Sequence, residues 1–212
     1  MKRIKLKDNN FLLLPEKAIY WKEKKILMAA DIHLGKASGF RVRGIPVPNG
    51  STETNLDKLT KLLNNFKPKT FLILGDLFHS KNKFSGSLIE EIKMRRERFP
   101  QIEFILTSGN HDKSFRKVIS SLKIKLYETP LIIDSFAFTH HPETVEGKYV
   151  FSGHIHPAVK LKEFRNHSVK LPAFHFSEVQ ALLPAFGEFT GTFLIKPNSG
   201  DKVFVVVDDE VV

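Results

Sequence analysis

The chain contains no cysteine, which excludes disulfides, thiolate metal sites and a cysteine nucleophile. Any metal ion would therefore have to be held by oxygen atoms and imidazole nitrogens. No apolar run approaches the roughly 18 residues of a membrane span, and the N-terminus lacks the continuous apolar segment of a signal peptide. From these absences we expect a cytoplasmic protein that makes no use of a membrane.

Acidic residues are the minority among the charged ones, 23 against 33 Lys and Arg, so that the formal net charge is +10. A basic surface favours a polyanionic partner such as nucleic acid. A second explanation competes with this one, because the lysines are scattered along the whole chain, as a lysine-rich proteome would also produce. Charge alone leaves nucleic-acid binding open.

The 212 residues, 42% of them hydrophobic, are enough for one domain with a substantial core, and we predict a single domain over residues 1–212. Leu56, Leu59, Leu63 and Phe66 recur at helical spacing and predict a helix from Ser51. A strand over 70–74 follows it, which completes a β-α-β unit. A helix-bearing first half and a strand-rich second half predict an α/β fold of two packed mixed β-sheets flanked by helices.

Polar side chains follow four short apolar runs, at the points where the predicted strands end. The four junctions are Asp31-Ile-His33, Gly75-Asp76, Gly109-Asn110-His111-Asp112 and Gly153-His154-Ile-His156, and His140 ends another predicted strand between the last two. Strand ends are where sites are built in open α/β sheets. Carboxylate, carboxamide and imidazole without sulfur suit Mn(II), Fe or Zn.

Each junction alone is a weak signal, but their order is specific. The ordered set resembles the calcineurin-like metallophosphoesterase superfamily, whose pattern runs Asp-x-His, Gly-Asp, Gly-Asn-His-Asp/Glu, His and Gly-His-x-His. Every part of that pattern is present, in order, over residues 31–156. The resemblance implies the metallophosphoesterase fold, a four-layer α-β-β-α sandwich.

The resemblance also implies two divalent metal ions, with Mn as the first choice and Fe or Zn as alternatives. It assigns Asp31, His33 and His156 to one ion, Asn110, His140 and His154 to the other, and Asp76 to both. Two such ions clamp a phosphate and lower the pKa of a bridging water, and the resulting hydroxide attacks phosphorus in line with the leaving oxygen.

Three neighbours of the ligands have expected roles. By the same resemblance His111 lies over the phosphate as general acid or charge stabiliser for the leaving group, and Asp112 is a partner that fixes the His111 ring. His140 and His141 are adjacent, so that only one should be a ligand. We choose His140 because it ends the strand, and keep His141 as the alternative.

Substrate contacts are expected from the long Gly- and Pro-rich connection that leaves Asp31 and His33. Lys36, Arg41 and Arg43 would contact phosphate, unless they are ordinary solvated charges. His79 is expected to contact the substrate or to support a ligand. Phe40, Phe78 and Phe84 could stack on unpaired bases, but core packing is the favoured interpretation for each of them, since the chain has 19 phenylalanines.

A narrower resemblance is to the bacterial DNA-ligase-associated metallophosphoesterases. Beyond the metal motifs it rests on Phe40-Arg41, on the run 44–48 and on the motif 183–191, which lies well away from the ligands in the sequence; His141 departs from the acidic residue expected there. This family implies manganese-dependent phosphodiesterases, including nucleases on single-stranded DNA, that work beside a DNA ligase, a helicase and an exonuclease in repair.

Three functions are therefore weighed. The first is a metal-dependent phosphodiesterase and endonuclease on single-stranded DNA, and the second is a small-molecule phosphoesterase with the same centre, acting on a nucleotide, a cyclic nucleotide or another phosphate ester. The third is a scaffold with a decayed metal site. Decay normally removes ligands, and none is missing here.

Overall fold

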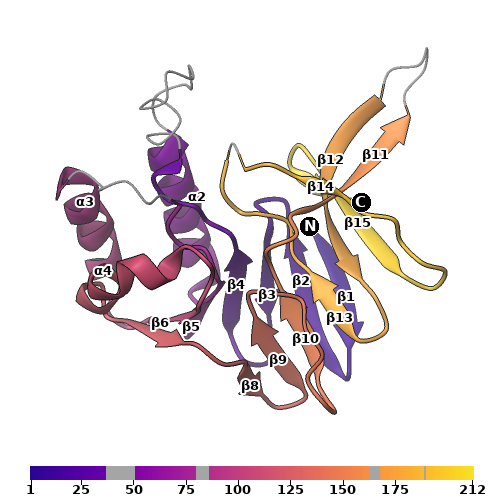
Figure 1. The fold of residues 1–212 in the computed structure, drawn as a ribbon, viewed down its shortest axis with the longest axis horizontal. Coiled ribbons are helices and arrows are strands. Elements are labelled where there is room, and N and C mark those ends of the chain that lie inside the picture. Colours follow the sequence, from indigo (N-terminus) through magenta and orange to yellow (C-terminus); the bar gives the residue numbers. More distant parts are fainter. Residues whose placement is uncertain (37–50, 80–85, 163–167, 189) are drawn as a thin grey trace.

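The computed structural model describes residues 1–36, 51–79, 86–162, 168–188 and 190–212. Its first sheet has seven strands in chain order (Figure 1). The first four pair antiparallel and the last four parallel, so that the fourth strand pairs in both ways. The strands are β1 (Lys2–Leu6), β2 (Asn9–Leu14), β3 (Ala18–Trp21), β4 (Ile26–Ala30), β5 (Thr70–Leu74), β6 (Glu103–Thr107) and β7 (Ile124–Tyr127).

The second sheet is also mixed and packs against the first. Its path runs β14-β11-β12-β13-β10-β9-β8, and β15 pairs with both β12 and β16. The strands are β8 (Leu131–Ile133), β9 (Phe136–Thr139), β10 (Tyr149–Ser152), β11 (Pro157–Lys162), β12 (Ser168–Phe176), β13 (Gln180–Leu182), β14 (Phe193–Leu194), β15 (Lys202–Val207) and β16 (Glu210–Val211).

The helices cover the outer face of the first sheet (Figure 1). They are α2 (Ser51–Phe66), α3 (Gly86–Glu97), the 3-10 turn η1 (Asp112–Phe115) and α4 (Arg116–Ser121). Helix α2 ends just before Lys67-Pro68, because proline cannot continue a helix. None of the helices in the described segments is long and apolar enough to cross a membrane.

Two apolar cores lie on either side of the first sheet. Alternation along β4 divides its residues between them: Leu27 and Ala29 face the helices, whereas Met28 and Ala30 face the second sheet. All five residues of β4 are buried, as expected for a strand covered on both faces. Trp21 is fully buried between the sheets, so it is a packing residue.

The predicted α/β fold of two packed mixed sheets flanked by helices is confirmed. The four-layer prediction also placed helices on the outer face of the second sheet. In the described segments every helix packs on the first sheet instead. The physical reason lies in the sequence after residue 148, where short strands joined by turns leave no run with helical periodicity. The described part of the chain therefore forms three layers, helices, sheet and sheet.

Candidate metal centre

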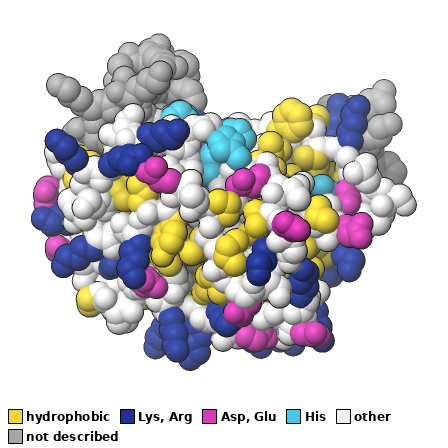
Figure 2. Space-filling view, turned by 60° about the horizontal axis from the view of Figure 1, so that its bottom comes forward, with side chains coloured by type: hydrophobic (Ala, Val, Ile, Leu, Met, Phe, Trp, Pro, Cys, Tyr) yellow, Lys and Arg dark blue, Asp and Glu magenta, His cyan; other side chains and the backbone are white. Residues whose placement is uncertain are grey.

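The predicted ligands come together where β4, β5, β6, β9 and β10 end. Three groups of three residues form here, and within each group the ligand atoms lie within 4.8 Å of one another. One group is Asp31, His33 and His156; a second is Asp31, Asp76 and His140; a third is His140, His141 and His154. Asp31 and His140 each belong to two groups, which makes one continuous cluster. Figure 2 shows histidine side chains reaching the surface here, beside hydrophobic side chains.

The backbone at this edge is held in a conformation that side chains disfavour. Positive φ angles between +47° and +66° occur at five of the predicted ligands, namely Asp31, His33, Asp76, His154 and His156. Each such residue costs free energy on the order of 1–3 kcal/mol, and residues of this kind concentrate at functional sites. The disfavoured backbone conformation thus coincides with the cluster of predicted ligands.

Glycines in two of the motifs leave space for ligands. A Cβ on Gly75, whose φ is +72°, would lie 2.0 Å from Nδ1 of His140, and a Cβ on Gly109 would lie 2.3 Å from Oδ1 of Asp76. Both distances are far below van der Waals contact. The Gly-Asp and Gly-Asn-His motifs therefore use glycine because the side chain of another ligand occupies the place of its Cβ.

Two histidines present a lone pair to the cluster. Nδ1 of His156 lies 2.9 Å from the carbonyl oxygen of Gly191, and Nδ1 of His140 lies 3.1 Å from that of Leu74. A carbonyl oxygen only accepts, so Nδ1 carries the proton in both rings, and in the neutral ring Nε2 carries a lone pair. This pattern, a ring N–H on a carbonyl oxygen, is typical of histidines that bind metal.

The lone pair of His156 faces another acceptor. Its Nε2 lies 3.3 Å from Oδ1 of Asp31, which is buried and has no hydrogen-bond partner. An unpaired carboxylate oxygen in a protein interior costs several kcal/mol, and a cation between the two acceptors would remove that cost. The residues present therefore fit the divalent ions that the sequence analysis expected.

His33 is held neutral beside its neighbours. Burial, reinforced by the positive charge of Lys36, lowers the pKa of His33 to about 2. Nδ1 of His33 lies 3.1 Å from Nδ1 of His79, and its Nε2 lies 3.9 Å from Oδ2 of Asp76. Neutral imidazole is the form that binds metal. His79, predicted to contact the substrate or support a ligand, thus lies against the ring of His33.

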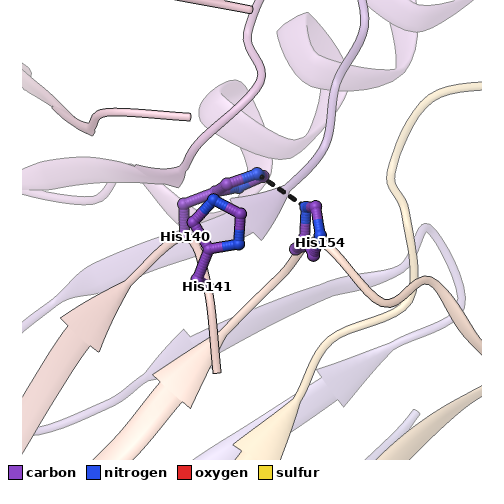
Figure 3. Close-up of side chains that lie close together, drawn as sticks. All are labelled: His140, His141 and His154. Atoms are coloured by element: carbon purple, nitrogen blue, oxygen red, sulfur yellow. Dashed lines mark hydrogen bonds between the residues drawn. The ribbon is translucent and has the colours of Figure 1, made fainter. Parts of the chain in front are cut away.

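His140 and His141 differ in their contacts. His140 is 3% exposed, and its Nε2 lies 3.1 Å from Nδ1 of His154 (Figure 3). The same nitrogen lies 3.8 Å from Oδ1 of Asp76. Nε2 of the exposed His141 lies 2.8 Å from Oδ1 of Asn110. Its ring thus contacts another predicted ligand. This geometry favours His140 as the ligand and gives His141 a supporting place beside Asn110.

Asp112 makes different contacts from those expected. Its carboxylate accepts hydrogen bonds from the amides of Leu77 at 3.0 Å and Gly109 at 2.9 Å. Both oxygens are thus engaged by backbone N–H groups, rather than by the His111 ring as the sequence analysis expected. Burial raises the pKa of Asp112 to about 6. Asp112 instead ties the loop after β5 to the loop after β6.

His111 lies next to Asp76 at the surface of the cluster. Its amide donates to Oδ1 of Asp76 at 3.0 Å, and its ring Nε2 lies 3.8 Å from Oδ2. Its side chain is 37% exposed, so it faces both the carboxylate and solvent. This placement suits a group that delivers a proton to a bound ester.

The expected substrate contacts are only partly described. Lys36 is half-buried; burial lowers its pKa, and the charges of Asp31 and Asp76 oppose that shift. Phe78 is fully buried in the core under the helices, which confirms core packing, the favoured interpretation, and excludes stacking for this residue. Arg41, Arg43, Phe40 and Phe84 lie outside the described residues.

A segment that lies far from the predicted ligands in the sequence contacts two of them in the structure. The segment is residues 183–191, without residue 189, and we call it the brace. The amide of Gly187 donates to the carbonyl oxygen of Asp31 at 3.1 Å, and the Gly191 carbonyl oxygen accepts from His156. The brace thus holds the backbone of one predicted ligand and the ring of another. Only long-range contacts reveal this, because more than 150 residues separate Gly187 from Asp31.

Helix α2 fastens the brace from the other side. The half-buried side chain of Lys58 donates to the carbonyl oxygen of Phe186 at 2.7 Å and to Glu188 at 2.9 Å. Asn55 accepts from the amide of Glu188 at 3.1 Å. Burial lowers the pKa of Lys58 to about 8, although the charge of Glu188 opposes the shift. The side chains of Lys58 and Asn55 thus hold the brace to α2, and the Gly187 amide in turn holds the brace to Asp31.

Substituting Lys58→Met should weaken metal binding as well as folding. The change leaves the Phe186 carbonyl oxygen without this donor, at a cost of about 1–3 kcal/mol in unfolding free energy. We expect Mn(II) affinity to fall about tenfold, the lower end for residues that support ligands. Calorimetric titration with Mn(II) and thermal unfolding of the metal-free protein measure the two effects.

The matched control is Arg95→Met on α3, which removes ion pairs with Asp57 and Glu91 without touching the brace. Its Mn(II) affinity should match that of the unchanged protein. If both variants lose the same affinity, the loss reflects general destabilisation and the brace has no part in holding the ligands.

Comparisons with known proteins agree with this geometry. A family model described as calcineurin-like phosphoesterase matches residues 24–147, which include Asp31, Asp76, Asn110 and His140. The chain belongs to the calcineurin-like phosphoesterase family. A search of curated proteins found no match.

Among solved structures, this calcineurin-like phosphoesterase is similar to the Pseudomonas putida nuclease MPE. The two are 30% identical, with a TM-score of 0.83 over 99% of this chain and 98% of that chain. The present chain also matches YfcE, a phosphoesterase from E. coli, at 13% identity and a TM-score of 0.45. The match covers 88% of this chain and 96% of YfcE. The protein is thus a phosphoesterase with a set of His and Asp side chains able to bind metal.

Proposed function

We propose that this phosphoesterase is a manganese-dependent phosphodiesterase that cleaves single-stranded DNA internally, in a repair setting. The observation that carries the metal-dependent chemistry is the unpaired Oδ1 of Asp31, which faces the lone pair of His156 at 3.3 Å. Similarity over nearly the whole chain to a protein named as a nuclease supports the choice of a nucleic acid.

The ligand set divides into two halves around Asp76. Asp31, His33 and His156 would hold one ion, and Asn110, His140 and His154 the other. Asp76 lies between them, with Oδ2 3.9 Å from His33 and Oδ1 3.8 Å from His140. When bound, divalent ions would supply polarisation of the phosphate and a lowered pKa for the attacking water.

The protein's own groups orient the substrate and move the proton. His111, held by its amide on Asp76, would donate a proton from its ring to the leaving oxygen. Its partial exposure lets the ring reach an ester that approaches from solvent. Lys36, Arg41 and Arg43 would contact phosphates of the strand and position it without reading sequence.

An extended polymer suits the surface position of the centre. Asn110 is exposed, and His111, His154 and His156 are partly exposed, so a phosphate within a chain can reach them. The net charge of +10 favours association with a polyanion at low salt. Both features support a nucleic acid over a small phosphate ester that would need an enclosing pocket.

The deciding experiment uses circular single-stranded DNA, because a circle offers no end. Protein stripped of metal and resupplied with Mn(II) should convert the circle to linear strands, and the Asn110→Ala variant should not. Bis(p-nitrophenyl) phosphate serves as the small substrate in parallel. Hydrolysis of this diester with an intact circle would contradict the endonuclease and favour a small-molecule phosphoesterase or an enzyme that requires an end.

A further inference from the structure

An exposed phenylalanine lies directly beside the metal centre. Phe193, the first residue of β14, is 64% exposed, and Tyr127 is the other exposed aromatic side chain among the described residues. The remaining described phenylalanines are buried or partly buried. An exposed large apolar side chain forgoes the free energy of burial, so its place next to a functional site calls for an explanation.

Backbone hydrogen bonds tie Phe193 to a predicted ligand. Its amide donates to the carbonyl oxygen of His156 at 2.9 Å. Two residues earlier, the carbonyl oxygen of Gly191 accepts from the ring of the same histidine at 2.9 Å. Phe193 and His156 are therefore held at a fixed separation, as a specific contact to a substrate at the centre requires.

The side chain continues into an apolar surface. Phe193 pairs with Pro157, and Leu161 pairs with Val169. Side chains alternate along a strand, so Pro157, Val159 and Leu161 share one face of β11. Phe193, Leu161 and Val169 therefore lie on one side of β14, β11 and β12. Leu161 is 43% and Val169 38% exposed. We call these three residues the arm face.

The arm face begins at the centre and leads away from it. Strand β11 starts directly after His156, and β11 and β12 project from the body of the molecule (Figure 1). The opposite side of the same strands carries the paired Lys160 and Lys170, and the ammonium of Lys170 bonds to the Thr192 carbonyl oxygen. An apolar surface that is continuous with a phosphodiester site suits a ligand with flat apolar groups on a phosphate backbone.

We propose that Phe193 stacks on an unpaired base next to the scissile phosphate, and that Leu161 and Val169 extend this apolar surface farther along the bound strand. This inference rests on the proposed function and adds to it the contact that recognises a single strand. Bases in a duplex are stacked on each other and cannot lie flat on the arm face. Stacking on an aromatic side chain is tolerant of base identity, so the preference is for unpaired structure and not for sequence.

Binding is the direct test. Fluorescein-labelled oligothymidylate is titrated with Mn(II)-loaded protein carrying His111→Ala, which slows cleavage and leaves the predicted ligands in place. Adding Phe193→Ala should weaken binding about tenfold, within the range for loss of one base–aromatic stack. The Phe193→Trp variant should bind the oligothymidylate as tightly as the protein that retains Phe193. The dependence of affinity on salt should stay the same, because no phosphate contact is lost.

Ile132→Ala is the matched control, because Ile132 is 44% exposed on β8, the opposite edge strand of the same sheet. It should not change binding. In the protein with His111 intact, Phe193→Ala should leave Mn(II) content unchanged, since the hydrogen bonds to His156 come from backbone groups.

Two results would overturn the inference: unchanged oligothymidylate binding in Phe193→Ala, or failure of Phe193→Trp to restore it. Failure of the proposed function has a different signature. In that case the unsubstituted protein leaves circular DNA intact, regardless of how tightly the variants bind oligothymidylate. If the oligonucleotide does not bind even with Phe193 present, the stacking contact is refuted irrespective of the cleavage result.

Discussion

Replacing Asp76 with asparagine should lower kcat/KM for bis(p-nitrophenyl) phosphate by on the order of 10³-fold, the upper range for removing one preorganised electrostatic group. Asp76 is a carboxylate near both halves of the ligand set, 3.9 Å from His33 and 3.8 Å from His140. An asparagine keeps the oxygen that accepts the His111 amide hydrogen bond, so the fold should persist. Kinetics and elemental analysis of bound metal measure the effect.

The control for this substitution is Asp57→Asn on α2. Asp57 is an exposed carboxylate that pairs with Arg95, and its loss removes the same charge from the protein without reaching the centre. Activity and metal content should remain near those of the unchanged protein. An Asp76→Asn variant that binds two equivalents of Mn(II) and has normal kcat/KM would contradict the assignment of Asp76 to both ions.

Separate substitutions of His140 and His141 should have very different effects. His140→Ala removes a buried ring whose Nε2 faces Asp76 and His154, and it also leaves a cavity in the core. We expect loss of one metal equivalent and a decrease in kcat/KM of at least about 100-fold. His141→Ala removes a hydrogen bond to Asn110, and the expected decrease is about tenfold, as for a residue that supports a ligand.

Metal content decides between the two histidines independently of activity. His140→Asn is a useful companion variant, since its smaller polar side chain leaves less of a void than alanine does. The assignment of His140 is refuted if His140→Asn retains both metal equivalents while His141→Ala loses one. In that case His141 would bind the ion and His140 would serve as the buried support.

The candidate centre was readable in the sequence because each ligand lies within a few residues of a strand end. Asp31 follows β4 directly and Asp76 follows β5 after Gly75, and parallel strands bring their carboxyl ends to one edge. The same reasoning left stacking open for Phe78 beside the favoured core packing, because a phenylalanine after a strand is compatible with both a buried and an exposed position. Its side chain occupies the core under the helices, where burial outweighs any surface role.

Strand β1 shows a further limit of local pattern. Its strand signal is short, because only Ile4 and Leu6 alternate with the charged residues Arg3 and Lys5. It nonetheless pairs with β2 as the edge of the first sheet. An edge strand tolerates charged residues because it faces solvent, and Ile4 and Leu6 pack against the core between the sheets.

The sequence by itself determined the α/β fold of two mixed sheets, the order of the ligand motifs and the absence of sulfur from the ligand set. These features depend on local periodicity and on residue type, which are legible along the chain. Tertiary structure alone decided the contacts made across long sequence separations. It attached Asp112 to backbone amides, placed the brace against Asp31 and His156, and exposed Phe193 beside the centre. Such contacts depend on which surfaces meet when the two sheets pack, and no neighbouring residues in the chain encode that meeting.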